Sequence, residues 1–133
     1  MIKLGLAGEL RLRNLDARRD WGFAGDYVRA LWLSLQQSAA GDYIVATGET
    51  HSVREFCEIA FAHVGLKYED FVVEEGEGRR GPESGLLVGN AAKAKRILGW
   101  VPSLTFEQLI KMMVDDDVRA LERNLEKDAP YNR

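Results

Sequence analysis

Residues 50–65 constrain the fold more than any other stretch of this chain of 133 residues. Ser52 and Glu55 have the spacing of a capping box, which marks the start of a helix, and Gly65 is a natural terminator. The apolar residues between them recur at helical spacing and are Val53, Phe56, Cys57, Ala60, Phe61 and Val64. Because such a stripe must face a core, we predict a packed domain built around this helix.

The rest of the chain predicts further short elements in alternation. Strands are expected at 9–15, 42–48 and 70–75, with 85–90 as a further candidate. Helices are expected at 26–37, 91–98 and 105–127; the first carries the stripe Val28, Leu31, Trp32 and Leu35, and the second is capped by Asn90 and ended by Gly99. We therefore predict one small α/β domain over residues 1–133, with several helices against a short sheet of about three to five strands. Fraying is expected from about residue 122, and no second set of elements remains for a complete Rossmann domain.

Charge and hydropathy exclude several classes of partner. A net charge of −3 and a pI near 5.4 leave no basic excess to follow phosphates, so we expect no nucleic-acid partner. No apolar run approaches the roughly 20 residues that cross a bilayer, and the N-terminus lacks the apolar core of a signal peptide. We therefore expect no membrane partner and a cytoplasmic location.

The residues that commonly carry catalysis or bind metals do not form a recognisable group. Cys57 is the only cysteine and lies among apolar neighbours, so a buried structural thiol is expected. His51 and His63 are too far apart for a metal pair on one helix face. The acidic run 115–117 points in different directions around a helix, which favours a solvated surface. We predict no metal site and no catalytic residue in this chain.

The glycine-rich stretch "EGEGRRGP" contains the spacing Gly76-x-Gly78-x-x-Gly81, which spells a dinucleotide-binding fingerprint. A functional fingerprint runs directly into a helix, whose free N–H groups bind the pyrophosphate. Here Pro82 follows and no helical stripe begins, while several glutamates add negative charge. The stretch therefore predicts a loop and no cofactor site.

The densest polar chemistry lies in "NLDARRDWGFAGDYVRALWLSLQ", where Arg18 and Arg19 precede Asp20 and Trp21. Two interpretations remain open on chemistry alone. One is a structural Arg–Asp pair with Trp21 in the core. The other is an arginine that binds an anionic ligand bidentately while its neighbours hold the loop.

Three segments carry a resemblance to a known family. "NLDARRDWGFAGDYVRALWLSLQ", "DYIVATGETHSVREFCEIAFAHVG" and "KAKRILGWVPSLTFEQLIKMMVDDD" resemble, in the same order, the C-terminal part of GDP-mannose 4,6-dehydratase, an extended short-chain dehydrogenase/reductase. The resemblance runs from about residue 2 to about residue 121 and depends most on "RDWGFAGDYV" and "ATGETHSVREF".

The resemblance implies a division of labour between two domains. The family enzyme, a lyase of GDP-fucose biosynthesis, binds NADP in an N-terminal Rossmann domain and uses a smaller C-terminal domain to help bind GDP-mannose. It oxidises the sugar at C4, removes water across C5 and C6, and returns the hydride to C6, with catalytic residues in the N-terminal half. We therefore expect this chain to be a fragment or a truncated reading frame that binds GDP or GDP-mannose, holds no cofactor and is inactive alone.

Individual residues can be carried over only where the motifs match. Arg19 matches the arginine of the family's "RDW" segment and is implied to contact the nucleotide's phosphate or ribose. Arg80 and Glu83 fall on charged positions that bind GDP in the family, although Gly85 stands where the family has aspartate. Arg13 replaces a family glycine. We expect Arg19, Arg80 and Glu83 to be the substrate-binding residues.

A different kind of function is also consistent with the resemblance. A domain separated from its cofactor-binding half exposes apolar surface, and such surface favours association. The alternative is therefore a stand-alone oligomeric interaction module that has kept the fold and lost the ligand. Expected partners are a second copy of this chain or a separate chain that supplies the Rossmann domain.

Overall fold

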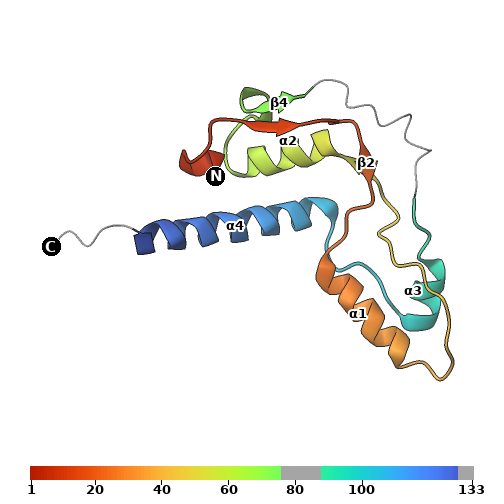
Figure 1. Ribbon diagram of the computed structural model, residues 1–133. Helices are drawn as coiled ribbons and strands as arrows, with labels where there is room; N and C mark the ends of the chain where they lie inside the picture. The colour runs from red at the N-terminus through yellow and green to blue at the C-terminus, as the bar shows by residue number, and fades with distance from the viewer. Residues whose placement is uncertain (76–87, 129–133) are drawn as a thin grey trace.

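The computed structural model describes residues 1–75 and 88–128, which form a small α/β fold (Figure 1). Its strands are β1 (Leu10–Leu12), β2 (Arg18–Arg19), β3 (His51–Ser52) and β4 (Val72–Glu74). Its α-helices are α1 (Ala24–Leu35), α2 (Val53–His63), α3 (Ala92–Leu98) and α4 (Phe106–Asp128), with short 3-10 turns η1 (Ile2–Leu4) and η2 (Tyr68–Asp70). The predicted fold class is confirmed, and the fingerprint loop lies outside the described residues.

The strands within the described residues pair in two separate ladders, whereas the sequence predicts a single sheet. β1 runs parallel to β4, with Leu10 opposite Val72, and β2 runs antiparallel to β3, with Arg19 opposite His51. The segment 42–48, expected to be a strand, joins no ladder with residues 1–75 or 88–128. Its apolar residues Tyr43 and Val45 pack against the α1–α3 core instead.

α2 lies between the β1–β4 pair and α4 (Figure 1). Its predicted capping box is confirmed: the Glu55 N–H donates to Ser52 Oγ at 3.1 Å, and the Ser52 N–H donates to Glu55 Oε2 at 2.7 Å. Past its end, Gly65 has φ +75°, a left-handed conformation that suits glycine. α2 packs against α4, with Phe56 meeting Phe106, and Phe106, Leu109 and Ile110 of α4 are buried.

α1 and α3 form a second packing cluster around Trp100, together with Ala30, Ala94 and Leu98. The indole Nε1–H of Trp100 donates to the main-chain oxygen of Asp26 at 2.7 Å. The buried Asp26 carboxylate in turn accepts the Ser103 N–H at 2.7 Å. These bonds tie the start of α1 to the chain that leads into α4.

The sequence predicts where helices end more accurately than it predicts which helix faces are buried. The Asn90 side chain accepts the Ala92 N–H at 3.0 Å and Gly99 ends α3 with φ +64°, as predicted. α4 continues to Asp128, past the position near residue 122 where fraying is expected. The apolar stripe of α1 does share one face, yet that face is exposed to solvent. No helix among the described residues combines the length and apolar character needed to cross a bilayer.

Candidate functional site

The Arg-Arg-Asp-Trp segment lies where the two packing clusters join, and Arg18 fixes it there. Arg18 Nη2 donates to the main-chain oxygen of Thr50 at 2.6 Å, and its Nη1 lies 3.6 Å from Glu55 Oε1. Both contacts hold β2 beside β3 and the start of α2. Arg18 therefore has a structural role.

Asp20 organises the loop that precedes β3. Its Oδ1 accepts the Thr47 N–H at 2.9 Å and the Thr47 hydroxyl at 2.6 Å, and its Oδ2 accepts the Gly48 N–H at 3.0 Å. Gly48 has φ +85°, so the turn itself favours glycine. The Asp20 carboxylate therefore binds this loop.

Trp21 is half-buried against α2. Its ring centroid lies 5.3 Å from that of Phe56, and its Nε1–H donates to the main-chain oxygen of His51 at 3.3 Å. Trp21 thus contributes to packing, as one of the two interpretations expects. The other interpretation is an arginine that binds an anionic ligand. Because Arg18 has a structural role, Arg19 is the candidate for it.

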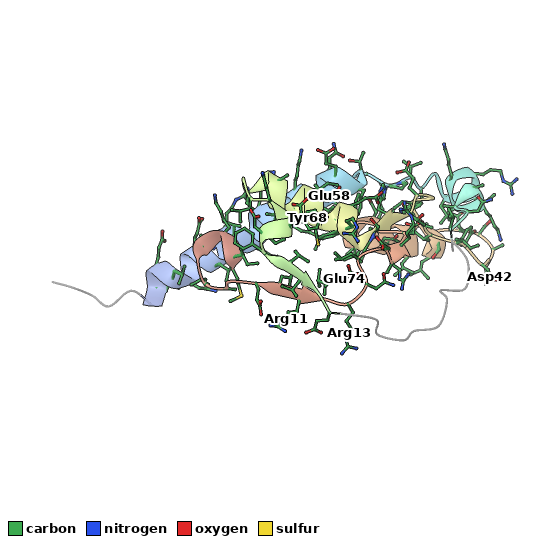
Figure 2. All side chains as sticks on the ribbon, turned by 90° about the horizontal axis from the view of Figure 1, so that it is seen from above. Arg11, Arg13, Asp42, Glu58, Tyr68 and Glu74 are labelled. Carbon is green, nitrogen blue, oxygen red and sulfur yellow. The ribbon has the colours of Figure 1, made fainter. Side chains whose placement is uncertain are left out.

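Arg19 is exposed on β2, and its Nη1 donates to the main-chain oxygen of Arg18 at 2.7 Å. Arg80 and Glu83, the other expected substrate-binding residues, lie outside the described residues. The structure therefore gives the surroundings of only one of the three. Arg13, which replaces a family glycine, is exposed beyond β1 and points away from the body of the protein (Figure 2).

A cleft of about 250 Å³ lies next to this segment and was not predicted from the sequence. Its lining comprises Trp21, Thr47, Glu49, His51 and residues 102–106. The ring of His51 stacks on Phe106, with centroids 3.9 Å apart and planes 3° from parallel. The cleft borders a second hollow of about 420 Å³ whose charged lining is acidic, with Glu49, Glu55, Glu58 and Glu107. An anion would be repelled from that side.

The pKa of the Glu55 carboxyl is altered by this arrangement. The hydrogen bond from the Ser52 N–H lowers the pKa of its carboxyl, and the charges of Arg18 and His51 act in the same direction. A carboxyl whose pKa is lower in the folded state stabilises the fold above its unfolded-state pKa, near 4.5, and loses that contribution as the pH falls through the folded-state value.

We therefore expect acid to destabilise the natural chain more steeply than a Glu55→Gln variant between about pH 5 and pH 3. Thermal melts across this range measure the difference. The effect is small, because the Glu55 side chain is 40% exposed. Glu69→Gln, at an exposed carboxylate, serves as the control. Parallel pH profiles for the natural chain and the Glu55 variant would contradict the expectation.

The starts of α2 and α4 do not fit a dinucleotide. α2 and α4 both begin with reciprocal side-chain caps, Ser52 with Glu55 and Thr105 with Gln108, which use N–H groups that a pyrophosphate needs. Within residues 1–75 and 88–128, His, Cys, Asp and Glu do not form a group of three suited to a metal ion.

Comparisons with known proteins extend these observations. A family model described as GDP-mannose 4,6 dehydratase matches residues 1–113. The chain is similar to GDP-mannose 4,6 dehydratase 1 of Arabidopsis thaliana, 51% identical over 122 residues that cover 92% of this chain and 34% of the plant protein. It is 40% identical over 140 residues to GDP-mannose 4,6 dehydratase of Homo sapiens, covering 92% and 38%. RMD from Pseudomonas aeruginosa complexed with NADPH superposes with a TM-score of 0.74 at 26% identity, over 86% of this chain and 38% of that one. The chain spans about a third of the length of the curated relatives it matches.

Proposed function

The chain belongs to the GDP-mannose 4,6-dehydratase family, and from this premise we propose that it binds the GDP moiety of a GDP-sugar, GDP-mannose in the first instance. The single observation that carries the proposal is the family match over residues 1–113, which includes Arg19 in its "RDW" segment. Oxidation at C4, loss of water and return of the hydride from NADP would belong to the remaining two thirds of a full-length relative.

The surroundings of Arg19 support this role. An arginine that is to bind a phosphate needs an exposed guanidinium on a backbone that does not move. Arg19 is exposed, while Arg18 bonds to Thr50 on one side and Asp20 binds Thr47 on the other. These contacts keep the arginine in place before a ligand arrives, which lowers the cost of ordering it.

Arg80 and Glu83 complete the proposed contact set. A second guanidinium would share the charge of the diphosphate, and a carboxylate would accept hydrogen bonds from ribose hydroxyls or from the guanine N–H groups. The chain's single cysteine and its lack of long apolar runs are in keeping with a cytoplasmic setting, which is part of the same proposal.

Isothermal titration calorimetry with GDP, GDP-mannose and UDP tests the proposal. We expect GDP and GDP-mannose to bind, and Arg19→Ala to weaken both by about ten- to a hundredfold, because a charge-assisted hydrogen bond contributes roughly 1.5–3 kcal/mol. Arg80→Ala should act in the same direction.

The matched control is Arg119→Ala, which removes a 63% exposed arginine of α4 that pairs with Asp116. It should leave the affinities unchanged. Negligible heat for every ligand would mean that the chain belongs to the family but does not bind its nucleotide. That result would favour the oligomeric interaction module. Equal affinity for UDP and GDP would mean that the site recognises the diphosphate and does not distinguish the bases.

A further inference from the structure

His51 lies directly opposite Arg19 in the antiparallel β2–β3 ladder. Side chains of directly opposed residues stand on the same face of such a ladder, with Cβ atoms about 4.5–5.5 Å apart. The fold thus places an imidazole beside the arginine that is proposed to bind the nucleotide. Histidine is the side chain whose charge ordinarily changes between about pH 5 and pH 8. This chain has only two histidines, His51 and His63.

The His51 ring is held in one orientation. It stacks on Phe106 with ring planes 3° from parallel, and the main-chain oxygen of His51 accepts the Trp21 Nε1–H at 3.3 Å. The His51 side chain is 28% exposed, and its Nε2 atom is buried without a hydrogen-bond partner among the described residues. A buried polar atom in that state calls for an explanation, because leaving it without a partner costs free energy.

Two carboxylates lie near the two ring nitrogens of His51. Nδ1 is 3.4 Å from Glu55 Oε2, and Nε2 is 3.7 Å from Glu49 Oε2. A neutral imidazole carries one N–H, so one nitrogen presents a lone pair to a negative charge. An imidazolium carries an N–H on both nitrogens and can pair with both carboxylates. Uptake of one proton therefore links Glu49, His51 and Glu55 and cancels one negative charge in the lining of the cleft.

The other charges around His51 leave this lining acidic when the ring is neutral. Carboxylates outnumber cations on β2, α2, the start of α4 and the loop that precedes β3. The charged residues of these segments near His51 are Arg18, Arg19, Asp20, Glu49, Glu55, Glu58, Glu107 and Lys111. A diphosphate at Arg19 is repelled by this excess, and a charged His51 reduces the repulsion.

We propose that His51 is a proton-sensitive positioning residue of the nucleotide site, and that its protonation strengthens binding of a GDP-sugar diphosphate at Arg19. The proposal rests on the proposed function and adds a regulation of the same site. The expected effect is roughly threefold in affinity between about pH 8 and pH 6, because a single charge near the surface is screened by water and salt. By linkage, the ligand must in turn favour uptake of a proton.

Calorimetric titration of the natural chain with GDP-mannose at about pH 6 and pH 8 tests the proposal. GDP-mannose is the probe because neither of its phosphates is a terminal group, whereas a terminal phosphate such as that of GDP titrates near pH 6. We expect roughly threefold tighter binding at the lower pH. At about pH 7 the heats should differ between buffers of different ionisation enthalpy, because binding takes up protons.

Three variants assign the pH dependence. His51→Gln should bind equally at both pH values. His63→Gln is the matched control and should keep the natural dependence, because His63 pairs with Asp115 at the opposite end of α2. Glu49→Gln changes a side chain that is 77% exposed, so folding is preserved. It should bind more tightly at pH 8 and show a smaller ratio between the two affinities. The α-amino group is common to all variants.

The outcomes separate this proposal from the proposed function. Equal affinity of the natural chain at both pH values, or tighter binding at pH 8, would overturn the role of His51 and leave nucleotide binding in place. A dependence that survives in His51→Gln and Glu49→Gln would assign it to another group and also overturn the proposal. Negligible heat at both pH values would overturn both.

Discussion

Replacing Trp100 by alanine is expected to lower the free energy of unfolding by about 3–5 kcal/mol. The side chain is 1% exposed and fills the space between α1 and α3. Its removal leaves a large cavity and also takes away the hydrogen bond that the indole N–H donates to the main-chain oxygen of Asp26. Because a domain's total stability is about 5–15 kcal/mol, the variant should be close to unfolded at room temperature. Urea denaturation followed by circular dichroism measures the change.

Trp32→Ala is the matched control for this substitution. It also removes a tryptophan side chain, but from α1, at a position that is 58% exposed. We expect a change within about 0.5 kcal/mol and a gain in solubility. Similar losses for the two variants would mean that Trp32 is buried in solution, as it would be in an assembly.

Asp20→Ala is expected to cost about 2 kcal/mol of stability and to weaken GDP binding. The carboxylate accepts two bonds from Thr47 and one from Gly48, and each N–H would be left to water. Losing them frees the loop opposite β2, so that Arg19 is less well held before the ligand binds. Thermal melts and the GDP titration measure the two effects separately.

Asp20→Asn separates charge from geometry. An amide keeps one acceptor oxygen but turns an N–H₂ group toward main-chain donors, so we expect an intermediate loss. Asp42→Ala is the control, because Asp42 is exposed at the far end of the molecule (Figure 2). A wild-type melting temperature for Asp20→Ala would refute the assigned role of its three bonds.

Helix limits were predictable because they depend on residues only a few positions apart. The Ser52–Glu55 box, the Asn90 side chain and the terminator Gly99 act within one turn of backbone. No knowledge of the tertiary fold was needed to place them. For the same reason the order of helices and the fold class followed from the sequence.

Tertiary contacts decided the features that were not predictable. The segment 42–48 has the composition of a strand, but Tyr43 and Val45 are partly buried by packing against the α1–α3 cluster. A side chain at Gly89 would overlap Ala46, so the chain near Gly89 approaches the segment 42–48 closely. Periodicity alone cannot distinguish these cases.

The cleft was missed for a related reason. His51 and Phe106 are far apart in the sequence and meet only because α2 packs on α4. One of two interpretations paired Asp20 with an arginine, and the structure shows its carboxylate accepting main-chain N–H groups of Thr47 and Gly48. The family resemblance singled out Arg19, and only the fold revealed the residues that hold it.

The separation of the apolar interior into two clusters affects how this chain comes apart. Leu109 and Ile110 lie in one cluster, Ala30 and Trp100 in the other, and polar bonds from Asp20 and Asp26 cross between them. Each cluster is small enough to open by itself, as a cooperative subunit of the structure. Hydrogen exchange would then follow two regimes, and a ligand at β2, where the clusters meet, would merge them into one. Nucleotide binding would in that way act as a cross-link.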